Sequence, residues 1–557
     1  MTMTANGSTD MPLPNDAAKR RYNLFLLVVA GLGGLLYGID VGIIGGALPY
    51  LEATFRVMDH GLRRPLSPSE LSTIVAAVLL GSVISTLFAG LLADWIGRKP
   101  LMVLAGVTFI FSIPIIALSH GFEPLFLGRL LQGISGGFIG VVVPLYLAEC
   151  LSASRRGRGT GVFQWLLTLG IVAAAVVGMY YSYRVAAVAA TADAATLLAY
   201  KDQVWRRIFW VSFPPGVLFV LGSLLVGESP RWLFQRGKSA AAFAVLLRSR
   251  SEEQAAVEVR EMEETSRSAE ATRSVGKKAH DSLLRRKYVI PFLLACVILF
   301  CNTATGINSI IGFNTGILLQ SGLSDLQAHW GYVIFTTVNF AMTMVGMMLV
   351  DRKGRKFLLV LGTSGIIVSL LGVGILFVKT EKLSLDSRSA VQTLVNSNQE
   401  LTLRFDQAEA SRLLSAQGNA VDTIDARRAS LAIIYSYGDF TAATSFVRSD
   451  DPIAAQIQIS RAGCVPANKV EALFKNPFGN LVATSNSTKD IKKNRLHAWI
   501  GQDNSHRSRH LICARAATNI QKIGRITAKE LQNVHRGHCQ PGSVHHTANI
   551  TVQLDKS

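Results

Sequence analysis

Residues 90–100 read GLLADWIGRKP, and residues 350–358 read VDRKGRKFL. In both stretches a long apolar run stops at an aspartate, Asp94 in the first and Asp351 in the second. A glycine, an arginine and a lysine then precede the next apolar run; they are Gly97, Arg98 and Lys99, and Gly354, Arg355 and Lys356. A turn that recurs with the same chemistry between apolar runs predicts a chain of two related halves.

Around these turns lie nine apolar runs, each long enough to cross a bilayer, which requires roughly 20 residues. They fall near residues 24–47, 71–93, 101–119, 125–147, 161–181, 208–226, 289–316, 331–350 and 357–378. The first run is too long and too rich in glycine for a cleaved signal peptide. With 49% hydrophobic residues among 557 and a mean hydropathy of +0.33, the composition excludes an ordinary soluble domain of this length.

The formal net charge is +19, which in a soluble protein would suggest a nucleic-acid partner. Here many basic residues stand between apolar runs, the arrangement that orients membrane proteins. Lys19, Arg20 and Arg21 precede the first run, and the loops after the even-numbered runs are basic. The positive-inside rule therefore places those loops, with both aspartate turns, on the cytoplasmic side. We expect the lipid bilayer, and no nucleic acid, among the partners.

One aspartate turn follows the second run, and the other follows the eighth, which is the second run of a second six-span half. The prediction is an all-α membrane protein with a cytoplasmic N-terminus (1–23), a complete six-span first half (24–226) and a cytoplasmic linker (227–287). The second half (288–379) is expected to be cut short after three spans, the seventh to the ninth.

The aspartate turns have a physical basis. Glycine permits a tight turn. An aspartate can cap the positive end of a neighbouring helix, and an arginine or lysine can pair with it. A pair that breaks when the two halves rock would hold one conformational state. The alternative is that short loops after spans are simply basic, but two copies at equivalent positions favour a gating role.

Five stretches resemble the major facilitator superfamily, specifically its sugar porter family. They are GRLLQGISGGFIGVVVPLYLAE (128–149), RRGRGTGVFQ (155–164), GESPRWL (227–233), TGIN (305–308) and VNFAMTMVGMMLVDRKGRK (338–356). The third departs from the family's Pro-Glu-Ser-Pro-Arg pattern, because Gly227 replaces the first proline.

The resemblance covers roughly residues 20–378. It implies the major facilitator fold and the uptake of a monosaccharide together with a proton, by alternating access. It implies a multi-pass protein of the cell membrane, with a bacterial inner membrane favoured over a eukaryotic plasma membrane. Neither an enzyme activity nor a cofactor nor a resident metal is expected.

Two charged residues lie inside predicted spans, where charges are expensive and usually functional. At about 1.5 Å per residue, Asp40 lies about 24 Å along the first span, and Arg129 lies about 6 Å into the fourth from the outside. These depths allow a pair that separates when the aspartate takes a proton. The resemblance implies that Asp40 is the proton site and that Arg129 tunes it. The alternative is an Arg129 that extends to the outer surface and an Asp40 at a helix end.

Gln164, Asn308 and Asn339 are neutral polar residues inside the fifth, seventh and eighth runs. Amides both donate and accept hydrogen bonds, which suits sugar hydroxyls. The resemblance implies that Gln164 and Asn308 match sugar-binding positions, and Asn339 is interpreted in the same way. The alternative is hydrogen bonding between helices, which amides often supply in membranes.

The seventh run departs from the family pattern. The family's two glutamines before Gly-Ile-Asn are here the shorter Asn302 and Thr303, which we retain as candidate substrate-binding residues. Gly312 and Phe313 stand where the family has a pair of aromatic residues. The identity of the sugar therefore stays open.

Further charges on the cytoplasmic side resemble the family's gating network; they are Glu149, Arg155, Arg156, Arg158, Glu228 and Arg231. The alternative is an exposed set whose members contribute little individually. We expect these residues to gate the inner side together with the two aspartate turns.

After Thr380 no further span follows, and residues 380–557 form a polar tail that is either extracytoplasmic or aberrant. Residues 385–475 contain helix-like stretches, and nothing else in the tail is typical of a packed fold. The cluster His535, His538, Cys539, His545 and His546 has spacing compatible with zinc, but a shifted reading frame explains this basic tail better. We therefore expect no metal site.

Three interpretations of function remain: a proton-coupled sugar transporter, a membrane sugar sensor that does not transport, and an inactive truncated transporter. Binding without uptake would favour the sensor. The sequence indicates neither the sugar nor the organism nor the oligomeric state.

Overall fold

The computed structural model describes residues 16–55, 68–152, 156–275, 286–320, 323–381, 384–396, 400–415, 429–437, 440–443, 447–449, 456–459 and 494–502. Within these residues, nine helices are long and apolar enough to cross a membrane. They coincide with the nine predicted runs, so the prediction of a predominantly helical membrane protein is confirmed.

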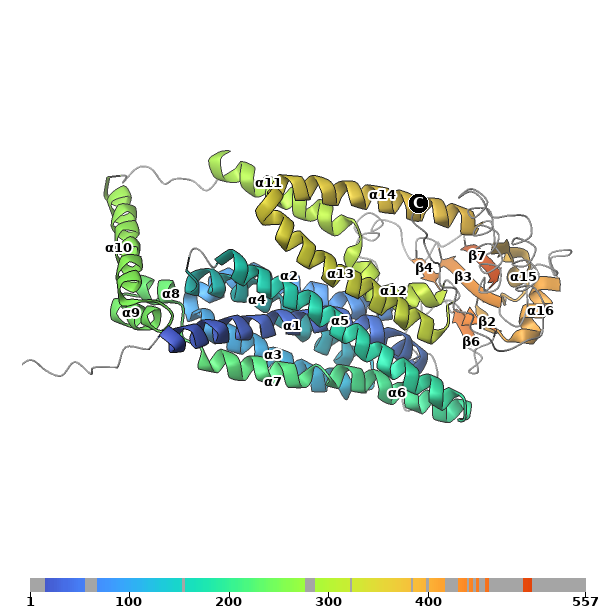
Figure 1. Ribbon diagram of the computed structural model, residues 1–557. Helices are drawn as coiled ribbons and strands as arrows, with labels where there is room; N and C mark the ends of the chain where they lie inside the picture. Colours follow the sequence, from blue (N-terminus) through green and yellow to red (C-terminus); the bar gives the residue numbers. More distant parts are fainter. Residues whose placement is uncertain are drawn as a thin grey trace, which may run out of the picture. The chain divides into compact units, whose positions relative to one another are not determined.

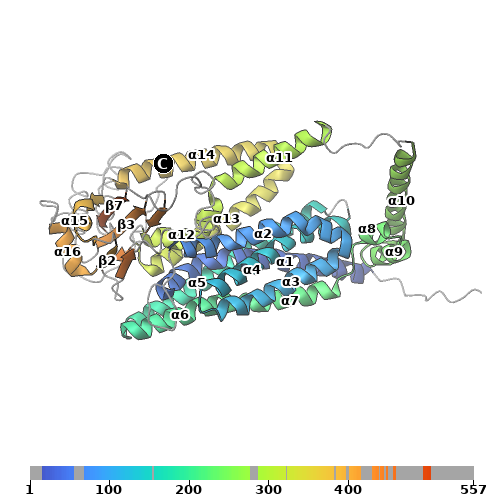
Figure 2. The same cartoon turned by 180° about the vertical axis from the view of Figure 1, so that it is seen from behind.

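The first half is built from seven helices (Figure 1): α1 (Asp16–Phe55), α2 (Pro68–Ile96), α3 (Arg98–Ala117), α4 (Phe122–Cys150), α5 (Arg156–Ala189), α6 (Ala194–Trp210) and α7 (Phe213–Leu225). The sixth span is divided between α6 and α7 just before Pro214 and Pro215, because proline removes a backbone donor. α1 packs along α5, α2 packs along α4, and α3 lies between α4 and α7. α3 and α7 lie side by side in both views (Figure 1 and Figure 2).

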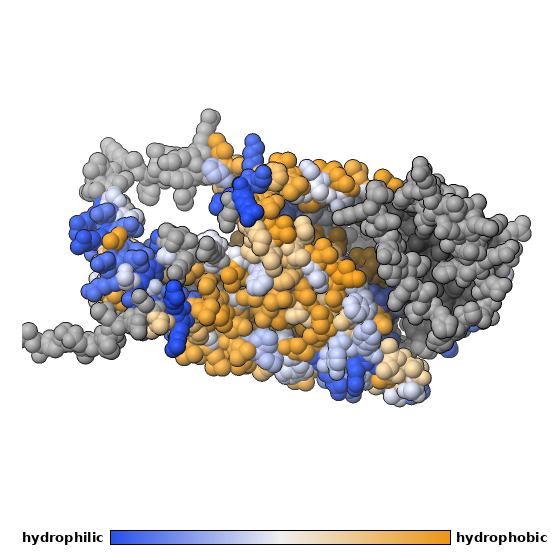
Figure 3. Space-filling view, viewed as in Figure 1, coloured by the Kyte–Doolittle hydropathy of each residue, from blue (hydrophilic) through white to orange (hydrophobic). Residues whose placement is uncertain are grey.

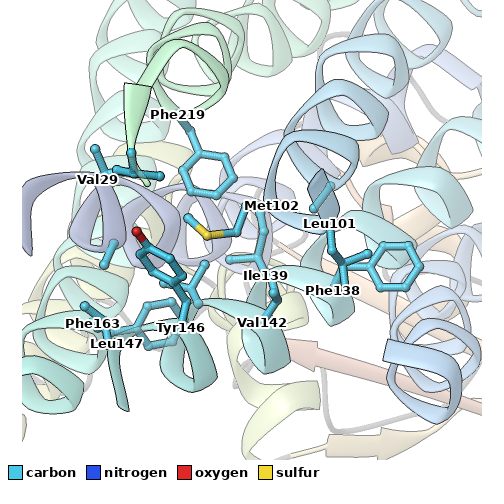
Figure 4. Packing of buried hydrophobic residues seen from close by; sticks show 14 of the residues in the cluster. Val29, Leu101, Met102, Phe138, Ile139, Val142, Tyr146, Leu147, Phe163 and Phe219 are labelled. Carbon is cyan, nitrogen blue, oxygen red and sulfur yellow. The ribbon is translucent and has the colours of Figure 1, made fainter. Parts of the chain in front are cut away.

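The core of this half surrounds α4 (Figure 4). Phe138, Ile139 and Val142 of α4 are buried in one cluster with Leu101 of α3 and Phe219 of α7. Large side chains on α2 and α7 are instead exposed, as expected where helices face lipid tails. Figure 3 shows this apolar surface over the spans, with hydrophilic residues gathered over the helices that follow α7.

Three helices follow the first half: α8 (Pro230–Gln235), α9 (Ser239–Leu247) and α10 (Glu252–Val275). The next three spans comprise α11 (Arg286–Ala304), α12 (Ile307–Gln320), α13 (Asp325–Lys353) and α14 (Arg355–Glu381). The seventh span is divided into α11 and α12 at Gly306, whose φ of 82° is readily adopted by glycine. The sequence analysis did not predict this break.

Both aspartate turns have the expected backbone. Gly97 separates α2 from α3 with a φ of 106°, and Gly354 separates α13 from α14 with a φ of 81°. An alanine at Gly97 would also collide with the Glu228 carboxylate. Glycine is therefore required at the first turn both by conformation and by space.

Residues after α14 form strands and short helices: β1 (Ser384–Asp386), α15 (Arg388–Gln392), β2 (Leu401–Arg404), α16 (Gln407–Ser415), β3 (Ala429–Tyr437), β4 (Phe440–Ala443), β5 (Val447–Arg448), β6 (Gln456–Ile459) and β7 (Asn494–Gln502). One antiparallel sheet has the order β1-β7-β3-β4, with β5 also paired to β3, and β2 pairs with β6 separately. β3 and β7 pair from Ala429 opposite Gln502 to Tyr437 opposite Asn494.

This unit has a hydrophobic core of its own, which includes Leu403 of β2, Leu413 of α16 and Leu431 of β3. The helix-like stretches predicted within 385–475 are present as α15 and α16, but the strands and the core among the described residues of this part were not predicted. Five of the described strands have only two to four residues, too few for their alternation to be recognised, whereas β3 and β7 have nine residues each and were missed as well. The histidine and cysteine cluster at 535–546 lies outside the described residues.

Candidate functional site

The structure brings the two charges inside the spans together. Asp40 of α1 and Arg129 of α4 are 0% and 1% exposed, and Arg129 Nη1 lies 3.7 Å from Asp40 Oδ1. Arg129 does not extend to the surface, so the alternative placement at the outer face does not hold. The guanidinium also lies over the ring of Phe209, 5.7 Å from its centroid. This is a buried ion pair whose two members come from different helices.

A third polar residue, Gln132, belongs to this pair, and the sequence analysis missed it. Arg129 Nη1 donates a hydrogen bond to Gln132 Oε1 at 2.6 Å, and Gln132 is fully buried. The spacing of three residues on one helix face could have indicated the contact. Among the described residues, no hydrogen-bond partner meets Gln132 Nε2, Arg129 Nε or either carboxylate oxygen of Asp40.

The candidate sugar-binding amides lie on three segments. Gln164 is exposed on α5, and Asn339 is half-buried on α13. Trp165 follows Gln164 in the chain, and Phe340 follows Asn339. These two aromatic rings stack with their centroids 5.4 Å apart. This stacking brings Gln164 and Asn339 to the same level of two packed helices.

The remaining substrate candidates surround the break in the seventh span. Asn302 and Thr303 end α11, Asn308 begins α12, and Gly306 lies between them. All three polar side chains are exposed in the structure, which includes no membrane. A divided span at this place frees backbone groups as well as side chains, as is common at substrate sites of transporters.

The first aspartate turn belongs to a polar cluster of Asp94, Arg98, Glu149, Glu228 and Ser229, which we call the inner network. Arg98 is 4% exposed and donates from Nε and Nη2 to both carboxylate oxygens of Glu149, each at 2.9 Å. Ser229 donates to the same carboxylate at 2.5 Å. Asp94 also contacts Arg98, at 3.0 Å, but its side chain is 70% exposed. The buried partner of the arginine is therefore Glu149 of α4.

The cap of α3 is Glu228 and not an aspartate. Its Oε1 accepts hydrogen bonds from the backbone N–H groups of Arg98 and Lys99, at 3.0 and 3.1 Å. A carboxylate at this end of a helix is favoured by the helix dipole and by the unpaired N–H groups there. A carboxylate therefore caps the start of a helix, as predicted, but it belongs to Glu228 of the Gly-Glu-Ser-Pro-Arg stretch and not to an aspartate of the turn.

Cationic side chains complement the opposite helix ends. Arg236 Nη2 donates to the carbonyl oxygens of Asp94 and Trp95 at the end of α2. Arg250 Nη1 donates to the carbonyl oxygen of Cys150 at the end of α4, at 2.9 Å. The residues after α7 therefore supply matching charges to three helix ends.

The other predicted gating residues whose side chains the structure describes lie at the surface. Arg231 is exposed, as are Gly354, Arg355 and Lys356 of the second turn. Arg155 lies outside the described residues, as do the side chains of Arg156, Arg158 and Asp351. Among the gating residues whose side chains the structure describes, it therefore brings together Asp94, Gly97, Arg98, Lys99, Glu149 and Glu228.

A second polar cluster, which we call the outer contact, joins the two halves. Asp325 at the start of α13 accepts hydrogen bonds from Tyr50 of α1 at 2.8 Å and Ser182 of α5 at 2.5 Å. His329 is fully buried, stacks on Tyr50 with centroids 5.6 Å apart, and lies 3.3 Å from the carbonyl oxygen of Gly46. The sequence analysis did not anticipate this cluster, because its members are far apart in the chain.

Comparisons with known proteins agree on one class. A family model described as Sugar (and other) transporter matches residues 26–394. The chain is 30% identical over 356 residues to a glucose transporter, GlcP, of Staphylococcus epidermidis. The aligned region covers 64% of this chain and 72% of GlcP. The chain is also 28% identical over 361 residues to a galactose-proton symporter of Escherichia coli. This aligned region covers 64% of this chain and 70% of that protein.

One solved structure extends this likeness to the fold. It is the proton:xylose symporter XylE of the major facilitator superfamily, bound to 6-bromo-6-deoxy-D-glucose. The identity is 26% and the TM-score is 0.51, over 61% of this chain and 71% of that chain.

Proposed function

The chain belongs to the sugar porter family of the major facilitator superfamily, and from this premise we propose that it carries a monosaccharide across a cell membrane together with a proton. The observation that carries the proposal is the buried contact of Asp40 with Arg129, 3.7 Å apart and shielded from solvent. Two relatives named as proton symporters of galactose and xylose support a coupled mechanism and a sugar of this size.

Asp40 is the proposed proton carrier. Ionised, it is held by the Arg129 guanidinium, because a buried carboxylate without a cation nearby is costly. Protonation removes that attraction and leaves α1 and α4 free to change their relative position. Coupling follows if the sugar binds tightly only to the arrangement in which Asp40 is protonated.

The proposed layout follows the charge asymmetry. Residues 1–23 and the linker at 227–287, with the inner network, would lie in the cytoplasm, and the outer contact would lie on the opposite side. In this arrangement the inner network stabilises the inner end of the first half. The outer contact closes the outer path between the halves.

The transport function is tested with purified protein in liposomes. A gradient of D-glucose, D-galactose or D-xylose should drive protons in the same direction as the sugar. Sugar entry without proton movement would leave transport standing and remove the symport. Binding without entry would favour a sensor, for which the described strands and helices after α14 offer a candidate output.

Substrate binding should depend on the amides. Gln164→Ala and Asn308→Ala are each expected to weaken sugar binding by about 1–3 kcal/mol, or about 5- to 150-fold, because a buried sugar hydroxyl loses its partner. Calorimetric titration with the transported sugar measures the change. Gln327→Ala, at an exposed helix start, is the control. Unchanged affinity in both variants would assign these amides to contacts between helices.

Opening of the outer side should depend on the outer contact. Tyr50→Phe removes a hydrogen bond to the Asp325 carboxylate but keeps the ring that stacks on His329. The loss is about 1.5–3 kcal/mol for a bond to a charged group, so hydrogen exchange of the first turns of α13 should accelerate by about tenfold or more.

The matched control is Tyr183→Phe. The Tyr183 hydroxyl of α5 accepts a hydrogen bond from the Trp330 indole of α13 at an exposed position between the same two halves. Exchange there should change little. Equal exchange rates in Tyr50→Phe and the unaltered protein would show that the Tyr50 hydrogen bond does not limit opening.

A further inference from the structure

Arg129 has two competing partners, and the structure shows which one it bonds. Its Nη1 makes a hydrogen bond of 2.6 Å with the Gln132 amide oxygen, whereas its contact with Asp40 is an ion pair at 3.7 Å. A charge-assisted hydrogen bond is normally about 2.7–2.9 Å long, so the distance to Asp40 is too long for one. The guanidinium is thus hydrogen-bonded to a neutral amide, while the carboxylate beside it accepts no hydrogen bond among the described residues.

The neighbourhood leaves few other groups that could take this role. Within the described residues, the titratable side chains that interact electrostatically with Asp40 are Arg129 and Tyr37. Tyr37 lies on α1 three residues before Asp40 and carries a phenol, not a basic group. Phe209 of α6 offers the guanidinium an aromatic face and no acceptor. Gln132 is therefore the one neutral acceptor bonded to Arg129 among the described residues.

We propose that Gln132 is the neutral partner that holds the Arg129 guanidinium when Asp40 is protonated, and that it thereby positions the charge that governs proton binding. The inference rests on the proposed proton role of Asp40. When Asp40 is ionised, the guanidinium turns from the amide toward the carboxylate. When Asp40 gains a proton, the guanidinium again donates its hydrogen bond to the Gln132 amide oxygen. It therefore keeps an acceptor inside the span.

This exchange makes Gln132 a positioning residue for coupling. A buried arginine without an acceptor is costly, so an amide on which the guanidinium depends more in the protonated state than in the ionised state stabilises the protonated state. Removal of the amide should make Asp40 harder to protonate. A purely structural amide, bonded equally in both states, would not change the protonation of Asp40 at all.

The test follows the carboxylic acid band of Asp40 in infrared difference spectra of the purified full chain in lipid nanodiscs, as the pH is varied. The band is identified by its loss in Asp40→Asn. In Gln132→Met, which keeps the length of the side chain but replaces the amide oxygen by a weakly accepting thioether, the midpoint is expected to move by about one pH unit to lower pH. Gln132→Leu is the second variant if the first is not recovered from membranes.

The matched control is Ser135→Ala on the same helix. Ser135 is fully buried and donates to the carbonyl oxygen of Ala105 at 2.7 Å, away from the ion pair. Its removal should leave the midpoint unchanged. An unchanged midpoint, or a shift to higher pH, in the Gln132 variants overturns the inference while leaving the proton role of Asp40 intact. A spectrum without an Asp40 band at any pH overturns both.

Discussion

Asp40→Asn is expected to abolish sugar-driven proton movement and leave sugar exchange largely intact. A carboxylate can gain and lose a proton, whereas an amide of the same shape cannot. The variant should also lose the pH dependence of uptake and the ability to accumulate sugar against a gradient. The measurement is proton movement into liposomes when sugar is added, compared between the variant and the unaltered protein.

The control for this experiment is Asp94→Asn. Asp94 is also a carboxylate beside an arginine, but its side chain is 70% exposed and its ion pair is expected to contribute little. It should retain sugar-driven proton movement. If Asp40→Asn still moves protons with sugar, Asp40 is not the coupling site, and the buried pair has a structural role.

The second large effect concerns the inner network. Arg98→Met should lower the free energy of unfolding by about 3–5 kcal/mol, because it leaves the Glu149 carboxylate in a buried position without its cation. The remaining hydrogen bond from Ser229 offsets only part of this loss. Chemical unfolding in detergent, followed by tryptophan fluorescence, measures the change.

The chain contains its own control, because Arg355 occupies the same position of the second Asp-x-x-Gly-Arg-Lys turn. Arg355 is exposed, so Arg355→Met should leave stability unchanged. Equal losses in the two variants would mean that Arg98 acts through the turn itself and not through the buried carboxylate. If both variants are as stable as the unaltered protein, the inner network serves gating alone.

The spans could be predicted because each one is a continuous apolar run, and lipid leaves a spanning chain almost no alternative to a helix. The depths of Asp40 and Arg129 along their spans only allowed a pair, and the resemblance to the sugar porter family implied that the two residues form one. The sequence also predicted tight turns at Gly97 and Gly354, where positive φ requires residues such as glycine.

What the sequence could not supply was the choice among partners of similar chemistry. Asp94 is four residues from Arg98 and was the natural candidate, but the packing of α3 against α4 brings Glu149 to the arginine. The outer contact was missed for the same reason: Tyr50 and Asp325 are 275 positions apart, and only the packing of α13 against α1 and α5 joins them. Of the strands after α14, those of two to four residues carry too little periodicity to be recognised, whereas the nine-residue β3 and β7 were missed for no such reason.

The cap of α3 has a consequence for the order in which the first half matures during synthesis. Glu228, which satisfies the start of α3, is 130 positions further along the chain than Arg98. Arg250, which satisfies the end of α4, follows Cys150 by 100 positions. A ribosome that has released only three or four spans has therefore not yet delivered the groups that complete them. Until then, the start of α3 and the end of α4 lack these protein hydrogen-bond partners. The first half becomes complete as a unit only after its last span has left the ribosome.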